Sequence, residues 1–525
     1  MKMKTRKKIS LFLAALLGLM SFSACDFLGK DNSSISGSVV DEETFEVLYK
    51  GKEAVNLAVG AQTEIPIGKD VGDKNYLRIK IATDLDIVGY IHYANNQNPN
   101  ETHKEKIYIE RNETEFTMFL DAFRVGAFGD FSKKIEKITL QNVSEEAGNL
   151  RIREVAISDR TYDNQEMLYI NNHALKIGAS LAVGGALCHV ESLNRSVVEY
   201  LDKDGKVRID EDIDASKVVA ITDEVNLINI HDLGREIQQS YYANVDESYG
   251  YAPDDEVLYE GIGGAVLYNP VQAGSAGHNQ TQIIDYRQTE DEIYVKSRPQ
   301  DWFFRNTQTD SYMESTYTFG EYNTLLVTNR FVNFSQFVNM ESAWVSSQET
   351  PAVYTVHPLN YFYCETVDGV INDPNLKPAT TGQPKLSVGD AVLENYYYVL
   401  FHEKVLGSWM ANVNDKGFGL GMYMPMAERY NASRGWAMTR YELVYNNQYN
   451  TSIYDLSDRR FVPSAYVNNY NYLCPNITRR MVDFVPFEYG FALYVGTVEE
   501  MRDSFKKLDD DGTIDNSSMD AWAKI

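Results

Sequence analysis

The sequence is poor in cysteine, proline and tryptophan, with 4, 14 and 5 of these among 525 residues. Cys188, Cys364 and Cys474 lie far apart, and no Cys-x-x-Cys pair is present. This spacing argues against a disulfide-stapled scaffold and against a structural zinc site. We expect three buried thiols, and one distant disulfide beside a single thiol is the alternative.

Positive charge is also scarce. The 49 lysines and arginines stand against 75 aspartates and glutamates, so the formal charge is −26. This balance argues against nucleic acid as a partner, because nucleic-acid binding depends on basic residues at phosphates. A charge-driven hold on anionic lipid is equally disfavoured. The sequence lacks G-x-G-x-x-G, P-loop, H-E-x-x-H and G-x-S-x-G motifs, which argues against nucleotide-binding, zincin and serine-esterase chemistry.

The N-terminal apolar run, residues 9–20, is too short to span a bilayer comfortably. Five basic residues precede it, and small residues follow it up to Cys25. We predict a signal peptide over residues 1–24 and lipid attachment at Cys25, which would anchor the chain to a membrane. Removal of the signal would take the formal charge from −26 to −31. Residues 25–44 read as a flexible tether.

The tether begins with Asp26 and is small, polar and weakly acidic. This start resembles the surface-export signals of Bacteroidota lipoproteins. The resemblance implies a cell-surface position on the outer membrane. It also implies an outer-membrane glycan importer as a partner in polysaccharide utilisation.

Alternating apolar and polar residues predict an all-β chain with few short helices. Residues 45–160 read as a jelly-roll or β-sandwich domain similar to carbohydrate-binding modules. Residues 161–525 read as a large two-sheet β-sandwich domain, which the resemblance described below makes a β-supersandwich. One helix is predicted near the C-terminus. Thr497 and Glu500 form a capping box, Met501 and Phe505 face the core, and the residues Asp509 to Gly512 end the helix as a solvated tail.

The segment Asn226–Tyr242 has the densest polar and aromatic content. Its mixture of carboxylates, amides and aromatic rings suits a sugar site. A buried ion pair beside a strand with one polar face explains it equally well. The predicted substrate-binding residues here are His231, Arg235, Glu236, Gln239 and Tyr241.

This segment resembles the early strands of galactose-mutarotase-like supersandwich proteins, a superfamily of carbohydrate-active enzymes. Asn229, Gly234 and Arg235 carry the resemblance, which implies a sugar cleft at this point. Further substrate-binding candidates come from the shaped loop 268–278 and from two tryptophan-containing segments. They are Gln272, His278, Asp301, Trp302 and Trp409.

Glycosidases need two carboxylates on either side of the scissile bond. Asp232 and Glu349 are the predicted catalytic pair, with Glu403 third; Glu349 is expected just before a Pro-led strand. The predicted function is a surface-anchored glycoside hydrolase. A non-catalytic glycan-binding lipoprotein and a polysaccharide lyase with His231, Arg235 and Tyr241 are the alternatives; an adhesin fits less well.

No cofactor or metal is predicted. Calcium is the cation that the acidic loop residues could hold, although acidic loops are usually just solvated. Those residues are Asp246, Glu247, Asp254 and Asp255.

Overall fold

The computed structural model describes most of the chain after residue 43. The described ranges are 44–51, 53–95, 102–120, 131–193, 226–228, 236–244, 267–275, 279–302, 308–336, 346–356, 359, 361–366, 369–371, 386–388, 391–393, 397–400, 405–413, 417–425, 438–441 and 470–522. Residues Thr44–Ile525 form one compact unit.

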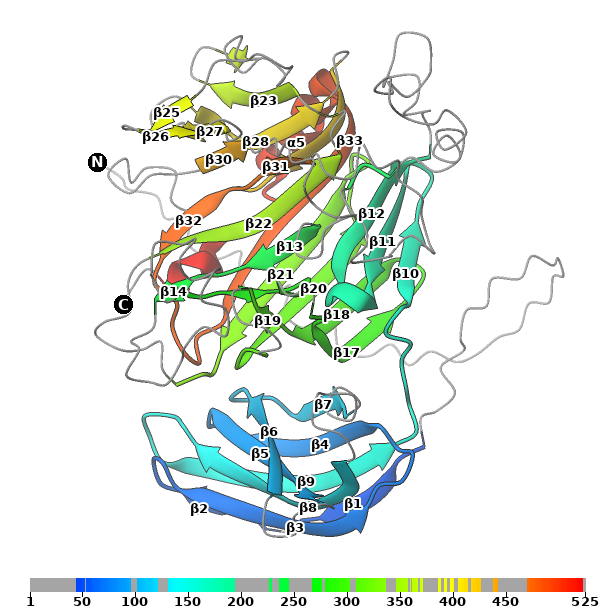
Figure 1. Ribbon diagram of the computed structural model, residues 1–525, viewed down its shortest axis with the longest axis vertical. Coiled ribbons are helices and arrows are strands. Elements are labelled where there is room, and N and C mark those ends of the chain that lie inside the picture. Colours follow the sequence, from blue (N-terminus) through cyan, green and yellow to red (C-terminus); the bar gives the residue numbers. More distant parts are fainter. Residues whose placement is uncertain are drawn as a thin grey trace, which may run out of the picture. The chain divides into compact units, whose positions relative to one another are not determined.

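Residues 46–158 form two antiparallel sheets (Figure 1). The first contains β1 (Glu46–Lys50), β9 (Gly148–Ser158), β4 (Tyr76–Thr83) and β7 (Glu115–Phe119), with β2 (Val55–Leu57) paired to β9. The second runs β3 (Gln62–Asp70), β8 (Phe131–Asn142), β5 (Ile87–Asn95) and β6 (Thr102–Ile109).

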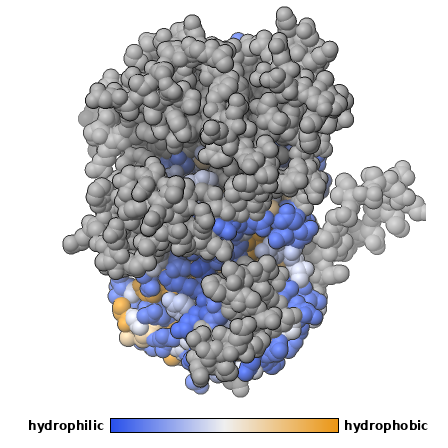
Figure 2. All heavy atoms as spheres, viewed as in Figure 1, coloured by the Kyte–Doolittle hydropathy of each residue, from blue (hydrophilic) through white to orange (hydrophobic). Residues whose placement is uncertain are grey.

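The period-two pattern explains this sandwich. Leu77, Ile79 and Ile81 alternate with polar residues along β4, and all three are fully buried. They share one core with Ile91, Ile138 and other aliphatic residues of the second sheet. On the face that Figure 2 shows, most of the described surface is hydrophilic. Val55, Val59 and Leu193 are the exposed large hydrophobic residues of the described chain.

Two nine-stranded sheets make up most of the rest. The sheet that we call the β13 sheet contains β10 (Met167–Asn171), β11 (Leu175–Ser180), β12 (Ala186–Ser192), β13 (Ile237–Ser240), β16 (Pro270–Val271), β19 (Gln300–Asp301), β22 (Ser346–Val356), β31 (Tyr470–Leu473) and β32 (Asn476–Arg479). The β21 sheet contains β17 (Gln282–Gln288), β18 (Glu292–Arg298), β20 (Ser311–Phe319), β21 (Leu325–Asn333), β33 (Phe487–Thr497), β29 (Phe418–Tyr423), β28 (Val405–Val413), β23 (Tyr361–Thr366) and β24 (Gly369–Ile371).

Smaller elements complete the described structure. Three strand pairs are β14 (Ala243–Asn244) with β15 (Leu267–Tyr268), β25 (Leu386–Val388) with β26 (Ala391–Leu393), and β27 (Tyr397–Leu400) with β30 (Met438–Tyr441). The described helical segments are η2 (Leu181–Val183), α5 (Val498–Asp511) and η6 (Ser517–Trp522).

The β13 and β21 sheets face each other across one large hydrophobic core. Ile177, Val190 and Ile237 contribute from the β13 sheet, and Val327 and Phe491 from the β21 sheet. Because side chains alternate along a strand, the residues between these core positions point away from the β21 sheet. We call that side the outer face of the β13 sheet; its opposite is the inner face.

Helix α5 covers the other side of the β21 sheet. Met501, Phe505 and Leu508 pack against Trp409 and Tyr423. The capping box of Thr497 and Glu500 is confirmed. The three aspartates Asp509, Asp510 and Asp511 are exposed to solvent, as predicted. They form the last turn of the helix instead of following it, and Gly512 caps that turn in the left-handed conformation that glycine favours.

The all-β fold class is confirmed, since several antiparallel sheets dominate the described chain. Within the described residues, no helix is long and apolar enough to cross a membrane. Cys188 and Cys474 are buried free thiols, as expected, whereas the side chain of Cys364 lies outside the described set. The division at residue 160 stays a prediction.

Candidate functional site

A polar patch occupies the outer face of the β13 sheet at strands β10, β11 and β12, which lie side by side in Figure 1. In one row Tyr169 pairs with Gly178, and Gly178 pairs with His189. In the next row Asn171 pairs with Lys176, and Lys176 pairs with Glu191. Directly opposite residues of an antiparallel sheet share a face. We call Tyr169, Asn171, Lys176, His189 and Glu191 the β10–β12 face.

A bulge in β12 shapes this patch. Gly178 pairs with His189 while Ala179 pairs with Leu187, so Cys188 is the extra residue. Such a bulge re-aims the side chains next to it, and it often lies near functional sites. Cys188 is buried, and burial together with the nearby charge of Glu236 raises the pKa of its thiol. Cys188 is therefore an inert thiol rather than a nucleophile.

His189 and Glu191 form a hydrogen-bonded pair. Their Nε2 and Oε2 atoms lie 3.0 Å apart; the His189 side chain is fully buried and that of Glu191 is 17% exposed. Burial, reinforced by the charge of Lys176, lowers the pKa of His189 to about 3. The imidazole is thus neutral near pH 7. Because a carboxylate only accepts hydrogen bonds, Nε2 of His189 carries the proton and donates to Glu191.

Tyr169 lies across the sheet at this point. A side-chain carbon added to Gly178 would come within 2.6 Å of Cε1 of the Tyr169 ring, so the missing side chain makes room for that ring. The ring meets His189 edge-on, with centroids 5.7 Å apart. The ammonium of Lys176 lies 4.9 Å from the Tyr169 centroid. Gly178, His189 and Lys176 together hold one partly exposed aromatic ring.

The face thus combines an aromatic ring, an ammonium donor and a carboxylate acceptor, with the carboxylate fixed from behind by a neutral histidine. Sugars are bound by this combination, since aromatic rings stack on C–H surfaces and charged groups bind hydroxyls. These residues were not among the predicted site residues. The alternation Cys188-His189-Val190-Glu191 on a strand was the available signal.

Several predicted site residues lie outside the described residues. They are His231, Asp232, Arg235, His278, Glu403 and the lipid-attachment residue Cys25, together with Asn229 and Gly234 of the resemblance and the acidic loop residues Asp246, Glu247, Asp254 and Asp255. Their roles stay predictions.

Gln239, Tyr241 and Gln272 lie together between the two large sheets, fully buried. The Nε2 group of Gln239 donates to Oγ of Ser315 at 3.0 Å, and its Oε1 accepts from the hydroxyl of Tyr241 at 2.9 Å. Nε2 of Gln272 donates to the same Ser315 oxygen at 3.0 Å. These side chains bond to protein groups; their binding of a glycan stays a prediction.

Glu236 is fully buried just before β13. The next residue, Ile237, points into the core, so Glu236 points to the outer face, near Cys188.

Glu349 lies within β22, opposite Ser240 and Asn476. Its predicted place before a Pro-led strand is wrong, because pairing with β32 carries β22 back to Ser346.

The loop predicted over residues 268–278 contains a short strand instead. Pro270 and Val271 form β16, where Val271 pairs with Ser240 of β13 and Pro270 with Asp301 of β19. Asp301 is fully buried and accepts a hydrogen bond from the backbone of Asn269 at 3.1 Å.

The two predicted tryptophans lie apart from the β10–β12 face. Trp302 is partly exposed beyond β19, and its backbone N–H donates to the Asn269 carbonyl at 2.9 Å. Trp409 is 4% exposed, packed against Phe505 of α5. The Trp409 contacts are those of a core residue, so those predicted site residues that the structure describes do not gather at one place.

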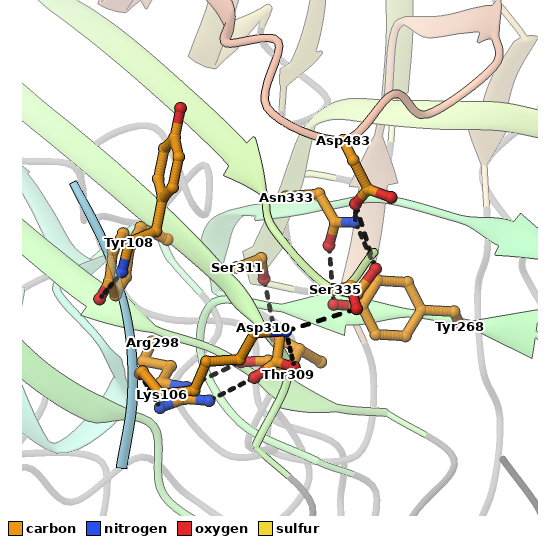
Figure 3. Close-up of polar contacts among 11 residues, drawn as sticks. Lys106, Tyr108, Tyr268, Arg298, Thr309, Asp310, Ser311, Asn333, Ser335 and Asp483 are labelled. Carbon is orange, nitrogen blue, oxygen red and sulfur yellow. Dashed lines mark hydrogen bonds and ion pairs between the residues drawn. The ribbon is translucent and has the colours of Figure 1, made fainter. Parts of the chain in front are cut away.

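A second polar cluster joins β6 to the β18–β20 region (Figure 3). Asp310 receives Nζ of Lys106 at 2.9 Å and Nη2 of Arg298 at 2.5 Å. Nearby, the Tyr268 hydroxyl donates to Asn333 at 2.9 Å, and Asn333 also bonds Asp483 (Figure 3). These contacts hold strands together, and we assign them a structural role. Among the described residues, no group of His, Cys, Asp and Glu could hold a metal ion.

Comparison with known proteins adds little. No protein-family model matches the chain, and no curated protein matches it. Among solved structures, it is similar to the 4-alpha-glucanotransferase of Thermococcus litoralis, with 8% identity and a TM-score of 0.29 over 64% of this chain and 40% of that one. The chain thus aligns with less than half of the glucanotransferase.

A second similar structure is the binding domain of botulinum neurotoxin DC in complex with SialylT. It aligns with 10% identity and a TM-score of 0.15, over 83% of this chain and 88% of that one. Both TM-scores are too low for either alignment to support a function.

Proposed function

We propose that the protein is a membrane-anchored, carbohydrate-active lipoprotein that binds a glycan on the β10–β12 face and hydrolyses it. The signal sequence and Cys25 support the anchor. The hydrogen-bonded Glu191–His189 pair beside the Tyr169 ring carries the proposal for the site.

The roles follow from exposure. Glu191 is the partly exposed carboxylate and faces the sugar, whereas buried His189 is a positioning residue that fixes Glu191 through Nε2. Tyr169 supplies the stacking surface. Hydrolysis needs a second carboxylate. Our candidate is Glu236, which lies just before β13, the strand that pairs with β12.

The test uses the full-length protein purified in detergent and a broad panel of neutral and acidic polysaccharides. Release of new reducing ends is the expected result. Glu191→Gln should lower kcat about 100-fold or more, the usual size of an acid–base contribution. Tyr169→Ala should weaken binding about 10-fold, whereas Tyr169→Phe keeps the ring and should bind normally.

Other outcomes separate the alternatives. Binding without any bond cleavage would make the protein a non-catalytic glycan-binding lipoprotein. A product with the absorbance of an unsaturated uronate would make it a lyase. Binding that survives Tyr169→Ala unchanged would remove the β10–β12 face from the proposal.

The anchor has a separate test. Cys25→Ala should abolish incorporation of labelled lipid and release the protein from the membrane fraction, since the lipid is the proposed attachment. Protease treatment of intact cells would then show whether the wild-type protein faces outward.

A further inference from the structure

The β10–β12 face carries no net charge near neutral pH. Lys176 contributes one positive charge and Glu191 one negative charge, and they are direct cross-strand neighbours. His189 adds none, because its pKa of about 3 leaves the ring uncharged. The site therefore presents one positive and one negative group side by side, and neither sign of charge dominates.

The two charged groups have complementary hydrogen-bonding capacity. An ammonium group only donates, and a carboxylate only accepts. A sugar hydroxyl does both, so neighbouring hydroxyls can donate to Glu191 and accept from Lys176 at once. Opposite residues of an antiparallel pair have Cβ atoms only about 5 Å apart, which suits groups on adjacent ring carbons. Both side chains are partly exposed.

We propose that this face takes a neutral sugar, held at a vicinal diol between Lys176 and Glu191, with Tyr169 beside the ring. The proposal rests on the proposed function above and names its substrate class. Both charged residues are then specificity-determining residues that touch the substrate.

The charge of the whole chain supports the neutral class. With 75 acidic against 49 basic residues, the surface repels polyanions at long range. One lysine beside one carboxylate gives no compensating positive field. A polyuronate or sulfated glycan would therefore meet repulsion during approach and the negative charge of Glu191 at the site.

The experiment uses matched polysaccharides whose charge alone differs, namely polyuronates and their carboxyl-reduced neutral counterparts, together with neutral plant and microbial glucans, galactans and mannans. Binding to full-length protein is measured by affinity electrophoresis and calorimetry at low and high salt. We expect the retained ligands to be neutral, with Kd changing less than about two-fold with salt, because no counterions are released.

Variants of Lys176 and Glu191 test whether these residues contact a vicinal diol of the sugar. Lys176→Gln and Glu191→Gln should each weaken binding at least 10-fold, and methylation of either hydroxyl of the diol should do the same. Lys69→Gln and Glu46→Gln are the matched controls, since these residues form an exposed ion pair at 3.4 Å far along the chain, and they should leave Kd unchanged. Thermal unfolding of every variant shows that the fold is retained.

Three failures are distinguishable. If the strongest ligand is acidic and its binding weakens 10-fold at high salt, the neutral class is wrong while glycan binding stands. If no glycan is retained, or if Tyr169→Ala changes nothing, the proposed function fails with it. Neutral ligands that bind Lys176→Gln as tightly as wild type would overturn the diol contact alone.

Discussion

The two faces of the β13 sheet use the same kinds of residue for opposite purposes. On the inner face Gln239, Gln272 and Tyr241 are fully buried, and the hydrogen bonds described above all go to protein groups. On the outer face Tyr169 and Glu191 are partly exposed and are braced by Gly178 and His189. Composition alone could not tell these faces apart.

The difference teaches how a polar residue becomes available for binding. A buried amide must be fully paired, because an unsatisfied polar group costs about 1–3 kcal/mol. On the inner face these polar groups bond to one another and to the facing sheet, which fixes how the two sheets pack. On the outer face, the buried His189 bonds to the partly exposed Glu191. This hydrogen bond orients the carboxylate, and the carboxylate can still accept hydrogen bonds from a ligand.

The largest effect should come from breaking the inner face. Gln239→Leu keeps the side-chain volume but removes the partners of the Tyr241 hydroxyl, the Ser315 hydroxyl and the Glu314 carbonyl. We expect the free energy of unfolding to fall by about 2–4 kcal/mol. Denaturant unfolding measures it.

Gln165→Leu is the control for that experiment, because Gln165 is exposed and should change stability by less than about 0.5 kcal/mol. Glycan affinity of the surviving folded Gln239→Leu protein should be normal. A variant that is fully stable yet loses binding would reverse our assignment of the two faces.

A pH-dependent effect of intermediate size is expected at Glu105 of β6. This carboxyl group is fully buried beside Tyr93 and Gln282, and burial raises its pKa from 4.5 to about 7. A raised pKa in the folded state stabilises the fold below pH 4.5, and that stabilisation is lost as the pH rises to 7. The loss should approach about 3 kcal/mol.

Thermal unfolding at a series of pH values tests this expectation. Glu105→Gln should flatten the dependence between pH 4.5 and 7 and be more stable than wild type at pH 8. Glycan binding, which depends on a histidine that stays neutral over this range, should not follow the same curve. An unchanged pH profile in Glu105→Gln would show that another group is responsible.

The sequence predicted the fold better than the site, for physical reasons. Strands such as β4 and β21 follow a local period-two pattern that one core face imposes. The capping box at Thr497 is equally local. The β10–β12 face depends on pairing between three strands and on a bulge, and neither is visible in a short window.

Residue type also misled the site prediction. Gln239 and Tyr241 lie in the densest polar segment, yet alternation along β13 turns them inward. Trp409 was predicted for the site because it follows Glu403 and precedes a polar loop, but it fills the space under α5. A single histidine on a strand such as His189 is usually structural, so its sequence context alone does not mark a site.

The smallest expected effect tests whether Gly178 makes room for the Tyr169 ring on the outer face. Gly178→Ala places a methyl group where the nearest Tyr169 carbon is 2.6 Å and the His189 side chain 3.1 Å away, so the tyrosine ring must tilt or lift. The backbone of Gly178 does not need a left-handed conformation, so the substitution acts through this contact. We expect the free energy of unfolding to fall by about 1 kcal/mol and the glycan affinity to fall several-fold.

Calorimetric titration measures the affinity. The double variant Gly178→Ala with Tyr169→Ala should bind no worse than Tyr169→Ala alone, because the methyl group then has no ring to displace. Independent, additive losses would mean that Gly178 serves the sheet and not the ring.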